Sequence, residues 1–142
     1  TRLGLKDDVQ FLGFVSDIPT FLSQVDIFVL PSLFEGLGVA VLEAMAAGKA
    51  VIASRVGGLA EVVLDGVTGF LVAPGDAEGL ANAIAKLAAD RSLSREMGQK
   101  GRARLKEHFT LAQMATKNEA YYYGLLEENR NRLPGTEAGS TL

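Results

Sequence analysis

The sequence contains no cysteine and a single histidine, His108. Without cysteine, disulfide bonds and thiolate metal sites are excluded. One histidine is too few for a histidine-rich metal cluster. The chain therefore has neither the composition of a disulfide-stabilised secreted domain nor that of a zinc-binding module.

An excess of positive charge is also missing, because 14 Lys and Arg residues face 17 Asp and Glu residues, for a net charge of −3. Nucleic-acid-binding surfaces are normally basic, so we expect no nucleic-acid partner. No apolar run approaches the ~18 residues that suggest a membrane-spanning helix, and residues 1–8 lack the hydrophobic region of a signal peptide. These absences predict a cytoplasmic protein. The first residue is Thr1 rather than methionine, which favours a fragment or a processed chain.

The 142 residues, 48% of them hydrophobic, suffice for one domain or most of one. Short apolar runs typical of buried strands alternate with segments of helical spacing. This alternation predicts the α/β class, with a Rossmann-like parallel sheet flanked by helices. The strands are expected at residues 9–13, 27–30, 50–53 and 69–72.

Several local signals mark where helices begin. Ser16 or Asp17 can cap a short helix that has Pro19 in its first turn. Asp76 is a natural N-cap, and residues 110–113 match a capping box. Residues 92–107 form a charged surface helix in this interpretation, weakened by Gly98 and Gly101, with a solvated basic run at residues 102–106. Residues 129–142 are polar and are predicted to be a disordered tail.

Residues 34–43 follow an apolar run and lead into a helix. Gly36 and Gly38 have no Cβ, so a ligand can approach the backbone closely. The first N–H groups of the helix lack intrahelical partners, and phosphate or sugar oxygens are good acceptors for them. Glu35 and Glu43 can accept hydrogen bonds from hydroxyl groups. In parallel sheets ligands bind beyond the carboxyl ends of the strands, where this turn, residues 13–15 and residues 57–58 are expected to converge.

Each glutamate also has a purely structural interpretation. Glu35 could complement the positive end of the helix dipole, and Glu43 could be a solvated helix residue. Glu43 nevertheless lies between Leu42 and Ala44 in an apolar segment. A carboxylate in such a segment is expected to need a partner.

The spacing of Glu35 and Glu43 makes an E-x7-E pair within FEGLGVAVLEAMAAGKAVIAS, followed in order by VGGLAEVV, DGVTGFLV and PGD. This series resembles the C-terminal domain of GT-B glycosyltransferases of the retaining family 4, or glycosyl transferases group 1. That group includes bacterial lipopolysaccharide and polysaccharide glycosyltransferases. The resemblance covers residues 9–126 and implies a C-terminal half of a GT-B fold that is truncated at its N-terminus.

The resemblance also implies roles for the residues that match the family's motifs. Glu35 would contact hydroxyls of the transferred sugar and is the candidate catalytic residue, while Glu43 would accept from the nucleotide ribose. The remaining candidate donor-binding residues are Phe14 and Val15 against the base, Gly36, Leu37 and Gly38 at the sugar and diphosphate, and Gly57, Gly58 and Glu61 on a further loop.

The implied reaction transfers a sugar from a nucleoside-diphosphate sugar to a glycan or lipid acceptor, with retention of anomeric configuration. No metal and no separate cofactor are expected, because in the family an Arg and a Lys neutralise the diphosphate. That pair, two strands and the acceptor domain would precede this sequence, and peripheral membrane association of the longer protein is compatible with the resemblance. Residues 1–128 would then be a partial donor-binding domain with a gap in its sheet, inactive when isolated. The alternatives are a non-catalytic GT-B-like nucleotide- or protein-binding module and a GT-B sugar epimerase.

Overall fold

The computed structural model describes residues 3–132, and side chains as far as residue 130. Residues up to Leu105 form one compact unit, and residues from Lys106 onward belong to a second. No helix within the described residues is long and apolar enough to cross a bilayer.

The first unit is built on a parallel sheet of three strands in the order β1 (Ile27–Leu30), β2 (Ala50–Ser54) and β3 (Gly69–Val72). The central strand β2 is fully buried, as its unbroken apolar sequence predicts. Strand β1 was expected to be buried on both faces, but its four residues are only half-buried. The reason is that β1 pairs only with β2 among the described strands, so its other edge is uncovered.

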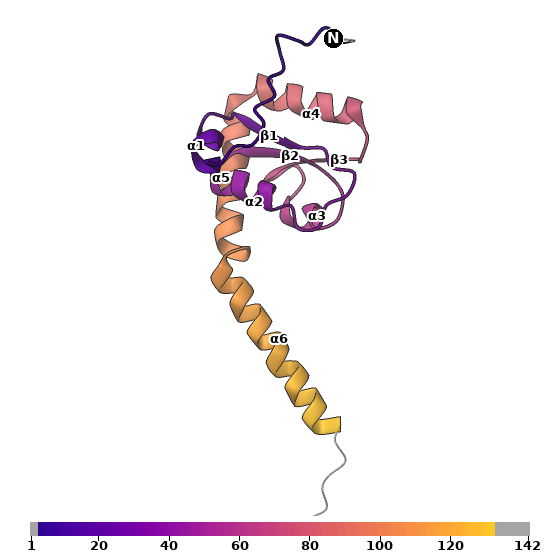
Figure 1. Cartoon of the computed structure of the whole chain (residues 1–142), viewed down its shortest axis with the longest axis vertical. Coiled ribbons are helices and arrows are strands. Elements are labelled where there is room, and N and C mark those ends of the chain that lie inside the picture. The colour runs from indigo at the N-terminus through magenta and orange to yellow at the C-terminus, as the bar shows by residue number, and fades with distance from the viewer. Residues whose placement is uncertain (1–2, 133–142) are drawn as a thin grey trace, which may run out of the picture. The chain divides into compact units, whose positions relative to one another are not determined.

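Helices cover both faces of this sheet (Figure 1). α2 (Val39–Ala46) and α3 (Leu59–Val62) pack on one face, and α4 (Ala77–Ala89) packs on the other. Alternate residues of β2 face the two layers, so Ala50 and Ile52 pack with Leu87 of α4. The predicted α/β class with a parallel sheet is therefore confirmed.

The helix starts agree with the local signals. α1 (Ile18–Ser23) is capped by Asp17, whose Oδ1 accepts a hydrogen bond from Thr20 N at 3.0 Å. The Asp17 pKa lies below its usual value, because Thr20 hydrogen-bonds to the carboxylate. Asp76 caps α4 by accepting from Gly79 N at 2.8 Å.

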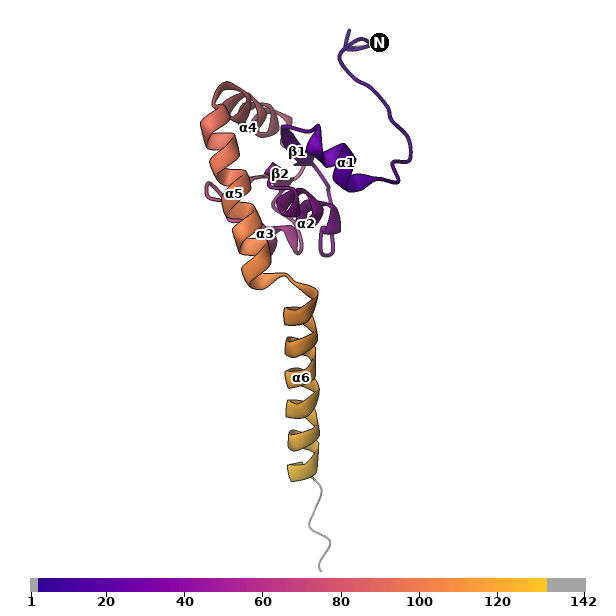
Figure 2. The same cartoon turned by 90° about the vertical axis from the view of Figure 1, so that its left-hand side faces the viewer.

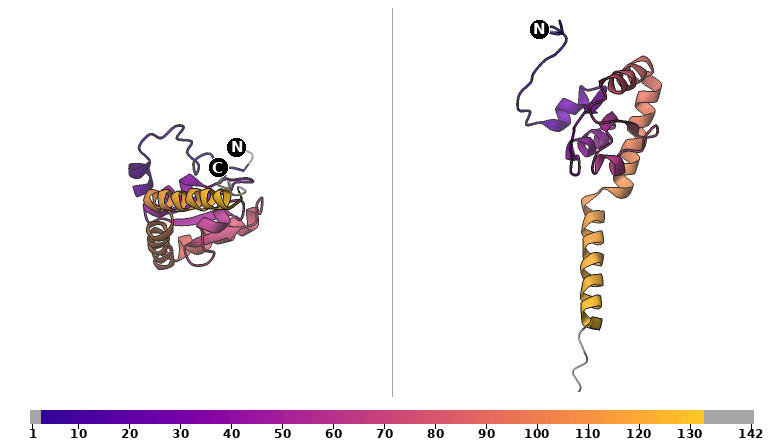
Figure 3. Two further views of the ribbon diagram at one scale, coloured as in Figure 1. Left: turned by 90° about the horizontal axis from the view of Figure 1, so that it is seen from below. Right: turned by 90° about the vertical axis from the view of Figure 1, so that its right-hand side faces the viewer.

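The prediction of a strand at residues 9–13 is wrong. These residues form no regular structure, and Figures 2 and 3 show the segment as an irregular loop that stands apart from the three strands before it enters α1. Phe11 is 94% exposed. A strand persists only where a neighbour accepts its backbone hydrogen bonds, and none of the described strands lies beside this segment.

α5 (Arg91–His108) is mostly exposed, as predicted for a charged surface helix, but it also has a buried face. Ser94, Met97, Gly98 and Gly101 are buried along one face. A Cβ on Gly98 would lie 2.1 Å from the carbonyl oxygen of Gly48, at the end of α2. The two glycines therefore allow close packing of α5 on the unit rather than merely weakening the helix.

In the second unit, α6 (Leu111–Arg132) begins at the predicted capping box. Thr110 Oγ1 accepts from Gln113 N at 3.3 Å, and Gln113 Oε1 accepts from Thr110 N at 3.0 Å. The helix includes residues 129–132, which were expected to be disordered. The rest of the predicted tail, residues 133–142, lies outside the described residues.

Candidate functional site

The loop after β1 ends at Gly38, which is the N-cap of α2 and has a φ of 74°. Only glycine adopts this left-handed conformation readily. The carbonyl of Gly38 accepts from Val41 N at 2.8 Å and from Leu42 N at 3.3 Å. No side chain caps the helix, so the earlier N–H groups are left for an external acceptor. The predicted order of strand, glycine turn and helix is confirmed.

A second loop, between β2 and α3, lies directly against the first. Gly58 N donates to Gly36 O at 2.8 Å. A Cβ on Gly58 would lie 2.3 Å from Gly36 O, and a Cβ on Gly57 would lie 1.8 Å from Glu35 O. No side chain larger than hydrogen fits at either position without moving the neighbouring backbone. The pair of loops, residues 35–38 and 57–58, is called the double-glycine junction below.

Leu59, the first residue of α3, packs against the junction at Gly38. It is fully buried, and its Cδ2 lies 2.3 Å from where a Cβ of Gly38 would stand. Gly38 is therefore favoured for its backbone angle, and a Cβ there would also displace a methyl group of Leu59. Residues 57–58, which the sequence placed in a loop near this turn, are closely packed against it.

Glu35 lies half-buried within the junction. Its Cγ is 3.6 Å from the position of a Gly38 Cβ, so the side chain folds over the glycine at the start of α2. Its carboxylate forms no hydrogen bond or ion pair with any of the described residues. An acceptor beside the start of α2 that has no protein donor is suited to ligand hydroxyl groups.

Glu43 differs from the expectation for a carboxylate in an apolar segment. Its side chain is exposed on α2, so burial does not oblige it to have a protein partner. It borders a groove of about 430 Å³ between α1 and α2, with Arg102 of α5 on the same wall. The apolar neighbours Ala44 and Met45 point into the core instead, because successive helix residues face different directions.

Phe14 and Val15 were expected beside the junction because they would follow a strand. That reason no longer holds, since residues 9–13 form no strand. Phe14 is 93% exposed and Val15 is half-buried. Of the three loops predicted to converge, the structure brings together the two that form the junction.

Glu61 is exposed on α3, but its backbone carbonyl accepts from a side chain that is distant in the sequence. Arg104 donates from Nη2 to Glu61 O at 2.7 Å and from Nε to Val62 O at 3.0 Å. A guanidinium at these last carbonyls also complements the negative end of a helix. Arg104 was interpreted as part of a solvated basic run. Arg104 follows Gly101 by three residues, as Gly101 follows Gly98, and this repeated spacing was the signal that it shares their packed face.

Arg55 follows β2, and its side chain contacts the turn before β3. Its Nη2 lies 2.5 Å from Asp65 Oδ2, while Asp65 Oδ1 accepts from Leu71 N at 3.0 Å. Partial burial raises the Asp65 pKa, but the hydrogen bonds from Leu71 and Arg55 and the charge of Arg55 outweigh it. The Asp65 pKa is therefore below its usual value, and the pair holds the turn before β3.

This lowered pKa predicts a pH-dependent contribution to stability. A carboxyl group with a depressed folded-state pKa contributes fully above the ordinary value of about 3.9, and the contribution is lost as the pH falls below it. We expect Asp65→Asn to lower stability by about 1 kcal/mol at pH 6, because both side chains are about half exposed and water screens them. Thermal unfolding midpoints at pH 6 and pH 3 would check this. A difference from the unchanged protein that is as large at pH 3 as at pH 6 would contradict it.

Among residues 3–132, no group of three or more His, Cys, Asp or Glu side chains could hold a metal ion. The arrangement instead combines glycine backbone, free helix N–H groups and a half-buried carboxylate at the carboxyl edge of a parallel sheet. In open α/β sheets this edge is the usual place for nucleotide ligands.

Comparisons with known proteins agree with this class of fold. The family described as glycosyl transferases group 1 matches residues 1–104. The chain therefore belongs to the glycosyl transferases group 1 family. Its fold is that of its solved neighbours, which are GT-B glycosyltransferases.

Three similar bacterial proteins illustrate the relationship. The chain is 36% identical over 130 residues to N-acetyl-alpha-D-glucosaminyl L-malate synthase of Bacillus anthracis, covering 92% of this chain and 34% of that protein. It is 40% identical over 128 residues to the lipopolysaccharide core biosynthesis mannosyltransferase LpcC of Rhizobium leguminosarum bv. viciae, covering 90% and 36%. It thus spans about a third of the length of these relatives. Anabaena Alr3699/HepE, solved in complex with UDP, superposes with a TM-score of 0.82 at 33% identity, covering 87% of this chain and 34% of that one.

Proposed function

We propose that this chain is the donor-binding part of a retaining, family 4 glycosyltransferase that uses a nucleoside-diphosphate sugar. The observation that carries the proposal is the double-glycine junction, which holds Glu35 and the start of α2 together at the carboxyl edge of the sheet. Membership of the family supports it. So do the complexes of Alr3699/HepE with UDP and with UDP-glucose.

In this proposal the junction and the helix α2 that follows it bind different parts of the donor. The backbone amides around Gly36, Leu37 and Gly38 bind sugar and diphosphate oxygens, and the positive end of α2 favours their negative charge. Glu35 accepts hydrogen bonds from hydroxyls of the transferred sugar. Glu43, one turn into α2, accepts from the ribose hydroxyls.

The remaining candidate residues have smaller roles in the proposal. Gly57 and Gly58 hold the junction in shape and keep the first loop open to the donor. Phe14 and Val15 are proposed to approach the base, and Glu61 is proposed to act near the donor through its loop. Residues 1–128 form the donor domain of a longer protein, in which preceding sequence supplies the acceptor site and the basic residues that face the diphosphate.

The chemical step breaks the bond between the anomeric carbon and the diphosphate oxygen and forms one to an acceptor hydroxyl oxygen, which loses its proton. The leaving diphosphate takes the electron pair of the broken bond. Catalysis then depends on positioning the two substrates and on stabilising the charge that develops on the diphosphate. Glu35 acts in this scheme as an acceptor that orients the sugar rather than as a covalent nucleophile.

The ribose assignment predicts that Glu43→Ala in the longer protein weakens nucleotide-diphosphate binding. One lost hydrogen bond to a charged group corresponds to about 1.5–3 kcal/mol, or roughly 10- to 150-fold in Kd. Isothermal titration with UDP, ADP and GDP identifies the preferred base and then measures this change. Glu78→Ala is the matched control, because Glu78 lies in the first turn of α4 on the other face of the sheet.

Equal affinity of the Glu43→Ala variant and the unchanged protein would overturn the ribose assignment. A screen of nucleoside-diphosphate sugars on the same longer protein tests the activity itself. Nucleotide binding without any sugar transfer would favour the non-catalytic binding module instead.

A further inference from the structure

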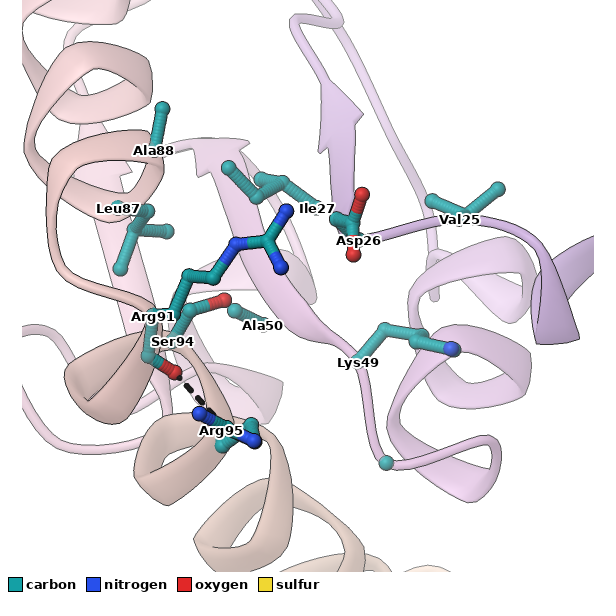
Figure 4. A pocket seen from close by; sticks show the side chains of 11 residues that line it. Val25, Asp26, Ile27, Lys49, Ala50, Leu87, Ala88, Arg91, Ser94 and Arg95 are labelled. Atoms are coloured by element: carbon teal, nitrogen blue, oxygen red, sulfur yellow. Dashed lines mark hydrogen bonds between the residues drawn. The ribbon is translucent and has the colours of Figure 1, made fainter.

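A second pocket, of about 360 Å³, lies at the opposite edge of the sheet from the double-glycine junction. It is bordered by Ile27 and Ala50, the first residues of β1 and β2, and by the first turns of α5 (Figure 4). Its volume lies within the range of about 300–1,000 Å³ that is usual for small-molecule sites. Because it opens at the amino ends of the strands, it does not overlap the proposed donor site.

The charge of this pocket is opposite to that of the chain. Three basic residues, Lys49, Arg91 and Arg95, and one acidic residue, Asp26, are among its lining residues. Three positive charges and one negative charge leave +2, whereas the whole chain carries −3. Such a local excess attracts anions.

The three basic side chains point in different directions. Figure 4 shows the Arg91 guanidinium extending across the pocket toward Asp26, with Arg95 beneath it. Arg95 Nε donates to Arg91 O at 3.2 Å, which orients Arg95 and leaves its terminal N–H groups available. Lys49 points away, and its Nζ donates to Ser23 O at 3.3 Å. Neither arginine forms an ion pair with any of the described residues.

Ser94 adds a hydroxyl group to the lining of the pocket. It is only 8% exposed, and Figure 4 shows its hydroxyl pointing into the pocket on the same side as the Arg91 guanidinium. The hydroxyl has no hydrogen-bond partner among the described residues. No buried side-chain oxygen among the described residues lacks a partner, so this hydroxyl is accessible from the pocket and can donate to a ligand oxygen there.

We propose that this pocket binds the phosphate group of a small phosphorylated metabolite. The guanidinium groups of Arg91 and Arg95 donate to the phosphate oxygens, as arginine does in bidentate anion recognition, and the Ser94 hydroxyl donates to a third oxygen. Val25, Ile27 and Leu87 form an apolar wall for the organic part of the ligand. The carboxylate of Asp26 repels a second negative group on the ligand. The pocket therefore favours monophosphates whose organic part is uncharged and hydroxylated.

The test is isothermal titration of the longer protein with inorganic phosphate and with glycerol 3-phosphate at constant ionic strength. Arg91→Gln and Arg95→Gln are each expected to raise Kd about tenfold or more, because each removes charge-assisted hydrogen bonds. Ser94→Ala is expected to raise it a few-fold. Lys100→Gln, which removes the same charge from the same helix outside the pocket, should leave Kd unchanged.

Absence of binding to the unchanged protein would overturn the proposal, and so would an equal loss in Arg91→Gln and Lys100→Gln. If the arginine variants do not fold, Ser94→Ala decides, because it keeps every charge, and an unchanged Kd in that variant would overturn the site. Vesicles of phosphatidylcholine with and without phosphatidic acid distinguish the source of the phosphate. Binding to the acidic vesicles without binding to glycerol 3-phosphate would contradict a soluble metabolite.

Discussion

Replacing Gly57 by alanine is expected to abolish measurable donor binding and to lower the thermal unfolding midpoint of the longer protein. Gly57 has a φ of 47°, and its added Cβ would lie 1.8 Å from Glu35 O. The left-handed angle alone costs an alanine about 1–2 kcal/mol. The overlap involves backbone rather than a flexible side chain, so it is relieved only by separating the two loops. We expect a total loss of about 2–4 kcal/mol in stability.

Gly75→Ala is the matched control for this experiment. Gly75 has a φ of 79°, but no atom lies within 4 Å of the position of its Cβ. It therefore carries the conformational cost without the collision. Calorimetry and nucleotide titration on both variants separate the two effects. If Gly57→Ala loses no more stability or affinity than Gly75→Ala, contact between the loops does not organise the site.

The second prediction with a large expected effect concerns the activity of the 142 residues produced alone. We expect no detectable sugar transfer and no donor hydrolysis from this chain, although the longer protein should be active with the same donor. In the structure, β1 is paired on one side only among the described strands. Large apolar side chains including Phe11, Phe14 and Phe34 are exposed. The chain also spans about a third of the length of its relatives, so we expect a complete site to need residues from other sequence.

This prediction is checked by assaying the isolated chain and the longer protein in parallel, with the donor that the longer protein prefers. Thermal unfolding of the isolated chain shows whether a folded species is being assayed. Turnover by the isolated chain would show that the described residues are catalytically sufficient. It would also remove the reason for assigning the diphosphate-neutralising residues to preceding sequence.

Much of the fold was predictable because its signals are local. Strand β2 was found from an unbroken apolar run, and α1 and α4 from the caps Asp17 and Asp76. The strand at residues 9–13 was not predictable in the same way. Its apolar pattern suits a strand, but a strand also requires a neighbour, and the pattern contains no information about whether one is present.

The candidate site was likewise predictable only in part from the sequence. The E-x7-E spacing of Glu35 and Glu43 and the glycine turn between them are visible in the sequence, and so is the family. The exposure of Glu43 was predicted wrongly, because composition around a helix residue does not show which way its side chain points. The engagement of Arg55 with Asp65 and of Arg104 with the end of α3 joins residues 10 and 43 positions apart, and no local pattern encodes such pairs.

By itself, then, the sequence determined the α/β class, the parallel strands and the turn at residues 34–43 that precedes α2, since each depends on neighbouring residues. Only the tertiary structure decided that Gly57 and Gly58 lie against the backbone of Glu35 and Gly36. It also decided that Gly98 lies against Gly48 and that Arg91, Ser94 and Arg95 border a pocket. These are contacts between segments that are distant in the chain, and they exist only after the sheet and its helices have packed.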